Sequence, residues 1–566
     1  MGSIQTTITE TDAKAQDWAT LAAAHRKQQF NNIPKEWRLD DDKIRSITGR
    51  GGSREGRLRE LGTAANAGIL SSAELEIAEK ATATEIVSKI RDGQVTAEEV
   101  TVAFCKMAAV AQQTISCLTE IFFDEGIERA RWLDSQLKAT GKVVGPLHGL
   151  PISMKDSFHM MGKYATTGYT EFLRRAPEKS NAALVNMLLD AGAVLYCKTN
   201  VPQTMMTADS ENHIFGRTLN PHKTNLTAGG STGGEGALVG FRGSPLGVGT
   251  DIAGSIRIPS LCCGTYGFKP TSNRIPFGGQ THYFNPVPLV RGIEPVAGPL
   301  ANSVDDLSLF MRTVTEQRPW KYDSTASNLQ WRDVEPKNKT LTIGILAEDP
   351  TWKLHPPVRG TLDRAIAILE AAGHKIVRLP FDPASSVGLG ARLGFQFFSL
   401  SGPSPDQVAA EAGEPLVTSV AMAVHPFNHG GFPVSQQANK FSELSDLNVA
   451  FEKYSAAWQQ VWTANGLDIV IGPGAISTSV PHDTYGVPVY TLMWNTLDYP
   501  AGIIPFGTSS SVEYPEQQKG TAEFDADYIP EATDGAPCAI QVIAPRYHDE
   551  ECLAAMKIID EELRRA

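Results

Sequence analysis

Residues 227–254 are the stretch that most restricts how this chain can fold, because ten of these 28 residues are glycine. Glycine lacks a Cβ atom, so it permits backbone conformations and close approaches that other residues do not, and it weakens ordinary helices and strands. We therefore expect this stretch to be a loop region that wraps closely around a ligand or a reacting group.

The rest of the chain alternates short apolar runs with helical patterns. Ser71, Thr82 and Thr96 each precede a glutamate by three residues, which is the capping box that opens a helix. Strands are expected at 150–155, 193–198, 340–346, 375–379 and 467–471, and helices at 13–31, 96–113, 182–191 and 358–372. This alternation predicts an α/β fold, with an N-terminal helical extension at residues 1–70 and one large domain at residues 71–566.

Charge and cysteine content exclude several classes of function. The formal net charge of -12 disfavours nucleic-acid binding, which needs basic surface to neutralise phosphates. The seven cysteines include no CxxC pair, so neither a zinc site nor a redox dithiol is supported, and we expect free thiols in a reducing compartment. No apolar stretch of about 18 residues and no secretory signal is visible, so we expect a cytoplasmic protein without a membrane span.

Two serines accompany the two glycine clusters of this stretch. Ser231 lies within the first cluster, and Ser255 directly follows the last glycine of the second. A serine that ends a glycine run can place its hydroxyl beside converging backbone N–H groups, which form an oxyanion hole. The candidate donors are the amides of Ile252, Ala253, Gly254 and Ser255. A phosphate-binding loop is the rival interpretation, but it needs Lys and then Ser or Thr after its second glycine, and Gly234 is followed by Glu235. A pair of tight glycine turns with surface serines also remains open.

A nucleophilic serine needs a base. The nearest histidines, His222 and His282, lie outside both glycine clusters, and His148 sits in a turn where packing is the simpler role. Lys155 ends an apolar strand, where partial desolvation would lower its pKa toward neutrality. A plain ion pair between Lys155 and Asp156 is the alternative.

These residues together resemble the amidase signature family. The resemblance rests on the block from Gly229 to Pro259, and it continues through residues 149–158, 198–202, 264–270 and 298–301. It covers the chain from about residue 71 to the end, and it implies a large mixed, twisted β-sheet with helices on both sides.

The resemblance also implies roles for individual residues. Ser255 would attack the amide carbonyl, Ser231 would relay the proton through its hydroxyl and have a cis peptide bond, and Lys155 would be the base. Thr232, Asp251 and Arg257 would support the loops, and the substrate would contact Met205, Gly229, Gly230 and Ser231. Met206 and Trp494 are candidates for either the pocket or the core. Ala253 stands where many members have glycine, and neither a metal nor a cofactor is implied.

Within the family the sequence looks most like the fungal acetamidase-like general amidases, which implies hydrolysis of small aliphatic or aromatic carboxamides and, by resemblance alone, a homodimer. Three alternatives stay open. They are a fatty acid amide hydrolase-like enzyme, a component of a tRNA-dependent amidotransferase, and a non-catalytic binding protein on the same fold.

Overall fold

The computed structural model describes residues 10–52, 54–281, 292–334, 340–400, 405–422, 433–521 and 525–566, and His282 lies outside them. The strands are β1 (Leu118–Ile121), β2 (Pro151–Lys155), β3 (Val194–Thr199), β4 (Glu211–Asn212), β5 (Gly216–Arg217), β6 (Leu246–Asp251), β7 (Tyr266–Lys269), β8 (Val296–Ala301), β9 (Thr342–Ile345), β10 (Lys375–Arg378), β11 (Ile469–Gly472), β12 (Ala501–Thr508) and β13 (Pro537–Ile543). Apart from the small β4–β5 pair, they form one eleven-stranded sheet in the order β1-β3-β2-β6-β8-β7-β12-β13-β11-β9-β10.

This sheet is mixed. Strand β2 runs parallel to both of its neighbours, β3 and β6, and β9 runs parallel to β10 and β11, whereas the other neighbouring pairs are antiparallel. The five strands expected from apolar runs correspond to β2, β3, β9, β10 and β11, with ends that differ by at most two residues. The predicted α/β fold class with a large mixed sheet is therefore confirmed.

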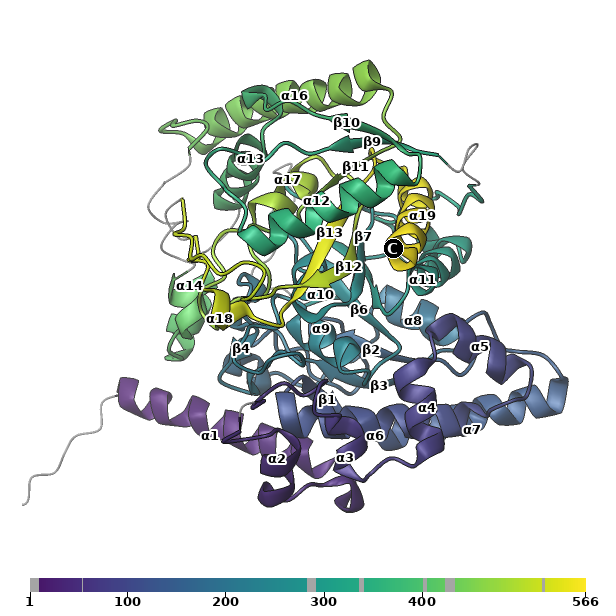
Figure 1. The fold of residues 1–566 in the computed structure, drawn as a ribbon. Helices are drawn as coiled ribbons and strands as arrows, with labels where there is room; N and C mark the ends of the chain where they lie inside the picture. The colour runs from purple at the N-terminus through teal and green to yellow at the C-terminus, as the bar shows by residue number, and fades with distance from the viewer. Residues whose placement is uncertain are drawn as a thin grey trace, which may run out of the picture.

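Helices cover both sides of the sheet (Figure 1). They are α1 (Glu10–Asn31), α2 (Asp41–Ile47), α3 (Thr63–Ala67), α4 (Ser72–Lys80), α5 (Ala83–Arg91), α6 (Ala97–Ile115), α7 (Phe123–Thr140), α8 (Ala183–Asp190), α9 (Gly233–Gly240), α10 (Arg257–Cys263), α11 (Val304–Glu316), α12 (Pro356–Ala371), α13 (Val387–Ser399), α14 (Pro405–Ala412), α16 (Lys440–Asn465), α17 (Val489–Thr496), α18 (Pro530–Thr533) and α19 (Asp549–Arg565). The capping boxes predicted at Ser71, Thr82 and Thr96 are all present at the starts of α4, α5 and α6.

Two neighbouring residues of β7 show how the two faces differ. A Cβ at Gly267 would lie 2.1 Å from Oγ of Ser260, so this residue faces α10. Phe268 points the other way, and there it lies beside Gly502, whose own Cβ would meet Met556 of α19. Successive strand residues alternate between faces, so α10 and α19 lie on opposite sides of the sheet.

The expectation that residues 227–254 form a loop region is wrong. Residues Gly233–Gly240 form the buried helix α9, and Leu246–Asp251 form the buried central strand β6. The glycines are there because neighbouring groups leave no room for a side chain. A Cβ at Gly234 would lie 2.2 Å from the backbone N of Asn200, and one at Gly249 would lie 2.4 Å from Cγ2 of Thr232. Close packing between buried elements has overridden the weak intrinsic preference of glycine for turns.

The N-terminal segment is docked onto the rest of the chain. The expected helix at residues 13–31 is α1, and its His25 ring lies 2.8 Å from the Glu120 carboxylate. Gln29 accepts a hydrogen bond from the backbone N–H of Ile121 at 2.9 Å, and it donates one to Glu120. Helix α1 is therefore joined to β1 at the edge of the sheet.

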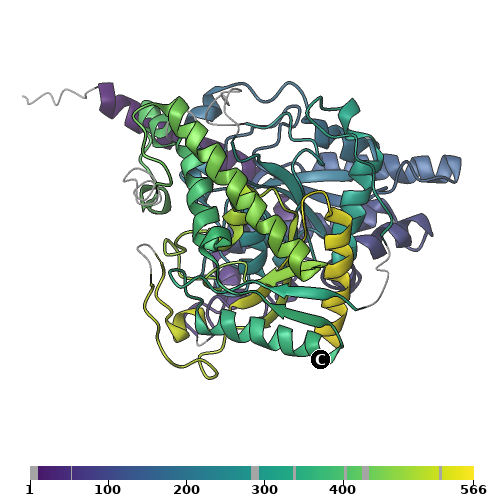
Figure 2. The same ribbon diagram turned by 90° about the horizontal axis from the view of Figure 1, so that it is seen from above.

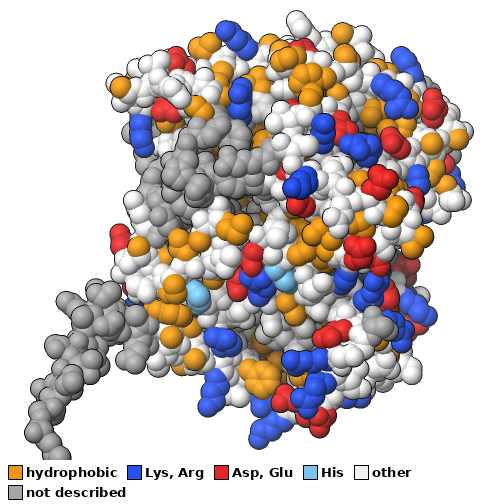
Figure 3. Space-filling model, turned by 60° about the vertical axis from the view of Figure 1, so that its left-hand side comes forward, with side chains coloured by type: hydrophobic (Ala, Val, Ile, Leu, Met, Phe, Trp, Pro, Cys, Tyr) orange, Lys and Arg blue, Asp and Glu red, His pale blue; other side chains and the backbone are white. Residues whose placement is uncertain are grey.

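The outer surface carries no segregated charge on the side shown in Figure 3, where acidic and basic side chains are interspersed. Seen from above, the long helix α16 crosses the molecule over α13, on which it packs (Figure 2). Among the described residues, no helix is both long and apolar enough to cross a membrane.

Candidate active site

Lys155 is the last residue of β2, and its side chain is 0% exposed. Its amine nitrogen Nζ lies 2.8 Å from Oγ of Ser231, 3.0 Å from Oγ1 of Thr232 and 2.8 Å from Oγ1 of Thr250. Within the described parts of the chain, no carboxylate forms an ion pair with this amine. Three hydroxyl groups therefore surround a buried lysine, and Thr250 is a neighbour that the sequence did not single out.

This burial changes the acidity of the lysine. Removal from water lowers the pKa of Lys155 to about 7, because the carboxylates of Asp251, Glu235 and Asp156 offset only part of the desolvation. Asp156 instead accepts hydrogen bonds from the backbone N–H and the hydroxyl of Thr166. The plain ion pair between Lys155 and Asp156 is thus excluded, and a large fraction of the lysine is uncharged at neutral pH.

The two candidate serines lie just before α9 and α10. The peptide bond between Gly230 and Ser231 is cis, and the backbone N–H of Thr232 donates to the carbonyl oxygen of Ser255 at 3.2 Å. Ser231, which contacts the lysine, is 3% exposed, whereas Ser255 is 9% exposed and reaches the surface of a cavity. No group among the described residues makes a hydrogen bond with the Ser255 hydroxyl, so it is free to meet a ligand.

A buried ion pair fixes the segment between β6 and α10. Nε and Nη2 of Arg257 lie 3.0 Å from the two carboxylate oxygens of Asp251, and both side chains are fully buried. Arg257 also donates to the side-chain oxygens of Asn495 and Gln541. Burial by itself would raise the pKa of Asp251, but the charge and hydrogen bonds of Arg257 outweigh it and hold that pKa at about 2. Two of the three predicted supporting residues, Asp251 and Arg257, are therefore partners in one buried ion pair.

The four candidate oxyanion donors are not equivalent. The N–H of Gly254 donates to Asp251 Oδ1 at 2.8 Å, so it is already used. The amides of Ile252, Ala253 and Ser255 have no hydrogen-bond partner among the described residues. Gly254 has a φ of 129°, and a Cβ there would lie 2.3 Å from Oγ1 of Thr491, which restricts this position to glycine. Ala253 does not have a positive φ, so its methyl group imposes no backbone strain.

Glu235 is a buried carboxyl group near the lysine that the sequence reasoning used only to argue against a phosphate site. It accepts hydrogen bonds from the hydroxyls of Ser153 on β2 and Thr199 on β3. Burial raises the pKa of Glu235 to about 8. A Cβ at Gly247 would lie 2.1 Å from its Oε2. Only the fold brings these partners together, since they come from three separate strands.

A cavity of about 1030 Å³ opens beside Ser255. The sequence-predicted residues in its lining are Met205, Met206, Gly230, Ile252, Ala253 and Ser255. Gly229, Ser231 and Gly254 are not among the described lining residues. Trp494 belongs to the core instead, with its ring 4.9 Å from that of Trp458.

The opposite walls of the cavity come from segments distant in the sequence. They are α13 with Phe395 and Phe398, the residues Ser419 and Met422, the start of α16, and residues 481–488 and 525–533. Apolar and polar side chains are mixed among them. Five carboxylates also line the cavity, on Asp209, Glu443, Asp483, Asp525 and Asp527, whereas the described lining contains neither lysine nor arginine.

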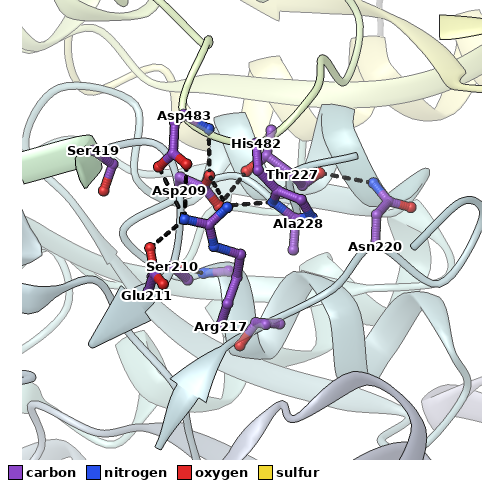
Figure 4. A network of polar contacts seen from close by, with 12 residues as sticks. Asp209, Ser210, Glu211, Arg217, Asn220, Thr227, Ala228, Ser419, His482 and Asp483 are labelled. Carbon is purple, nitrogen blue, oxygen red and sulfur yellow. Dashed lines mark hydrogen bonds and ion pairs between the residues drawn. The ribbon is translucent and has the colours of Figure 1, made fainter. Parts of the chain in front are cut away.

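Arg217 lies beside this lining and ties two of its segments together. Its guanidinium contacts Glu211 and lies 2.8 Å from Asp483, with Asp209 at 4.0 Å (Figure 4). Asp209 also contacts the ring of His482 and accepts the N–H of Asp483 at 2.8 Å. The segment after η3 (Gln203–Met205) and the loop at 481–488 are therefore held together by a charged network that keeps a net negative charge.

The other polar and thiol groups point to no additional chemistry. Within the described ranges, no three His, Cys, Asp or Glu side chains gather as metal ligands. The seven cysteines are buried free thiols. His148 accepts the backbone N–H of Val144 at 3.0 Å, which fits the predicted role in its turn.

Comparison with known proteins places the chain in one family. The family model described as Amidase matches residues 99–553. An amidase from Gibberella moniliformis is 38% identical over 97% of this chain and 99% of its own length, and an acetamidase from Emericella nidulans is 36% identical over 95% and 97%. Among solved structures, a fatty acid amide hydrolase matches with a TM-score of 0.87 at 30% identity, covering 99% of this chain and 97% of its own.

A component of the glutamyl-tRNA(Gln) amidotransferase from Thermotoga maritima is 17% identical with a TM-score of 0.60, covering 84% of this chain and 93% of its own, which is a likeness of fold alone. The family match and the fungal relatives together cover nearly the whole sequence. This chain is therefore a member of the amidase signature family, whose activity is the hydrolysis of amides.

Proposed function

We propose that the protein hydrolyses the C–N bond of a carboxamide through an acyl-enzyme on Ser255. The observation that carries this proposal is the contact of 2.8 Å between the buried amine of Lys155 and the hydroxyl of Ser231, in a segment hydrogen-bonded to that of Ser255. A buried, largely neutral amine is a competent general base, and a relay through Ser231 connects it to a hydroxyl at the cavity surface.

The steps of the reaction follow from these positions. Neutral Lys155 takes the proton of Ser231 as Ser231 takes that of Ser255, and the Ser255 oxygen bonds to the amide carbon. The oxyanion that forms can accept hydrogen bonds from the unpaired amides of Ile252, Ala253 and Ser255. The C–N bond then breaks as the leaving nitrogen receives a proton through Ser231. Water attacks the ester by the reverse relay, releases the acid and restores the neutral lysine.

For the substrate we propose an uncharged aliphatic or aromatic carboxamide. Apolar side chains such as Met205, Ile252 and Phe398 line a cavity of about 1030 Å³, at the upper end of the usual range for small-molecule sites. This volume leaves room for acyl groups well beyond acetyl. The similarity to a fatty acid amide hydrolase favours a second candidate, an amide with a longer acyl chain.

Ammonia release from a panel of amides tests the proposal. The panel runs from acetamide through benzamide and indoleacetamide to a long-chain primary amide, with wild type beside Ser255→Ala. Ser244→Ala is the matched control, since Ser244 is buried in the same glycine-rich stretch, donates to the backbone oxygen of Leu246 and is not among the described lining residues of the cavity. We expect Ser255→Ala to abolish turnover and the control to retain it. Turnover that survives in Ser255→Ala would overturn the assignment of the nucleophile.

A further inference from the structure

Residues 414–422 form a wall of the cavity that no catalytic motif includes. Ser419 and Met422 line the cavity directly. The hydroxyl of Ser419 lies 3.4 Å from that of Thr207, which lines the cavity from the segment after η3. In Figure 4 Ser419 stands beside the network of Arg217 and Asp483. Residues 414–422 therefore bound part of this cavity.

One side chain fastens this wall at three points. Gln203 is 0% exposed, and its Nε2 donates to Oε1 of Glu414 and to the backbone oxygen of Pro415, both at 3.0 Å. Its Oε1 accepts the backbone N–H of Val417 at 3.0 Å. Both the nitrogen and the oxygen of the Gln203 side-chain amide are therefore hydrogen-bonded to residues 414–417. We name these three hydrogen bonds the clamp.

Glu414 and Pro415 also form hydrogen bonds with residues other than Gln203. Glu414 is 3% exposed, and its Oε2 accepts the backbone N–H of Thr170 at 2.9 Å and the Thr170 hydroxyl at 2.7 Å. The ring of His213 lies 3.0 Å from the oxygen of Pro415, and it contacts the ring of Trp18 on α1. Burial raises the pKa of Glu414, and the hydrogen bonds from Thr170 and Gln203 oppose this shift by stabilising the carboxylate. Loss of the Gln203 amide would leave buried polar groups unpaired.

Gln203 also begins the turn η3, which carries Met205 to the cavity. The next residues, Thr204 and Met205, have φ values of 77° and 58°, which residues other than glycine rarely adopt. Such a conformation persists where the surroundings enforce it. Met205 lines the cavity. Gln203 therefore precedes one lining residue by two positions in the chain, and its side chain is hydrogen-bonded to the segment that supplies Ser419 and Met422.

We propose that Gln203 is a positioning residue that sets the range of acyl groups this enzyme accepts, by holding residues 414–422 and the Met205 turn in place. The proposal rests on the proposed amide hydrolysis at this cavity. Gln203 is not among the described lining residues, so it acts through the wall rather than on the substrate. Acetamide needs only the space next to Ser255, whereas a larger acyl group must also contact the wall.

The experiment compares Gln203→Ala with wild type by two readouts. The first is hydrogen–deuterium exchange of the peptide that contains residues 414–422, where we expect exchange to become about tenfold faster because local opening follows lost hydrogen bonds. The second is kcat/KM for a long-chain amide divided by kcat/KM for acetamide. We expect this ratio to change about tenfold, mainly through KM, since residues away from the reacting atoms alter uniform binding.

Gln113→Ala is the matched control. Gln113 also makes three hydrogen bonds, in its case all to backbone: it accepts from the N–H of Leu39 and donates to the oxygens of Trp37 and Ala109. None of these three partners lines the cavity as described. We expect this variant to leave both readouts as in wild type. A ratio that shifts equally in Gln113→Ala would overturn the proposal, because the effect would then be general loosening.

A second pair of variants keeps the proposal testable if Gln203→Ala does not fold. Gln203→Glu alone brings two carboxyl groups together, whereas the double variant Gln203→Glu/Glu414→Gln restores a donor and an acceptor across the same contact. We expect the single variant to be impaired and the double variant to recover most of the wild-type substrate ratio. Failure of the double variant to recover any of it would contradict the clamp.

The readouts separate two kinds of failure. If wild type hydrolyses no amide, the proposed function fails, whatever the exchange of residues 414–422 shows. If wild type is active and exchange is unchanged in both Gln203 variants, the clamp itself is refuted. Faster exchange with an unchanged substrate ratio refutes the assignment of selectivity to this wall.

Discussion

The catalytic wall and the far wall of the cavity are built by different means. On the catalytic wall, β2, α9, β6 and α10 are neighbours in the central sheet or pack directly on it, and glycines bring their backbones into contact. The far wall comes from residues 414–422, 481–488 and 525–533, together with α13 and the start of α16, and all of these lie outside the sheet. Side-chain hydrogen bonds such as those of Gln203 and Arg217 hold the first two of these segments.

This difference separates the chemistry from the choice of substrate. Displacement of a residue in the sheet moves the reacting groups and is costly throughout the core, because packed interiors transmit strain. Displacement of a far-wall segment is instead expected to change the space offered to the acyl group. Changes on the catalytic wall should therefore abolish turnover, and changes on the far wall should shift preference.

The largest expected effect is that of Lys155→Met, which keeps an apolar side chain of similar length but removes the amine. Loss of the general base should lower kcat by about 10³-fold or more on every amide tested. Circular dichroism and thermal unfolding establish that the variant is folded. A loss confined to one amide would break the comparison, since it would make Lys155 a residue of substrate choice.

Next in size is the effect of a side chain placed between α9 and its neighbours. Gly234→Ala should lower the free energy of unfolding by about 3 kcal/mol, because its Cβ would lie 2.2 Å from the backbone N of Asn200. Gly388→Ala is the control. Gly388 is also the second residue of a helix, α13, but the nearest atom to its Cβ would be a side-chain oxygen of Asp349 at 3.2 Å. Urea unfolding of both variants gives the comparison, and equal stabilities would remove the argument for glycine-dependent packing.

The pH dependence should be about tenfold per pH unit on the acid side. The pKa of Lys155 is lowered to about 7, so the neutral base is the major form above pH 7 and about one tenth of the total at pH 6. We expect kcat/KM for a neutral amide to rise from pH 5.5 and to level off above pH 8. A profile that is flat across this range would show that Lys155 is not the base.

The smallest effect concerns the carboxylates that line the cavity. An amide that carries a carboxylate, such as 4-carbamoylbenzoate, should have a kcat/KM roughly 3–10-fold below that of 4-methylbenzamide, because like charges repel across the cavity. The gap should narrow at high salt, which screens exposed charges. Equal or faster turnover of the anionic amide would show that the charge of the far wall does not act on the substrate.

The sequence is sufficient to propose the residues of the catalytic wall, because they lie in short, recognisable segments. Lys155, Ser231, Ser255 and the Asp251–Arg257 pair can all be identified without the fold, and the fold brings Lys155 and Ser231 into contact. The secondary structure of residues 227–254 cannot be predicted in the same way, because glycine propensity describes an isolated segment and not the close packing around it. The far wall is also beyond prediction, since its segments are separated from the motifs by more than a hundred residues.

The adjacency of β2 and β6 has a consequence for the behaviour of the enzyme on heating. The two strands are parallel neighbours, with Met154 paired to Val248, so Lys155 and the segment that carries Ser255 leave the sheet at the same edge. The spacing of the proposed base and nucleophile is then set by two neighbouring strands inside the large sheet. The far wall has fewer such supports, and locally weak regions open first. On warming, discrimination between large and small amides should fade at a lower temperature than the turnover of acetamide itself.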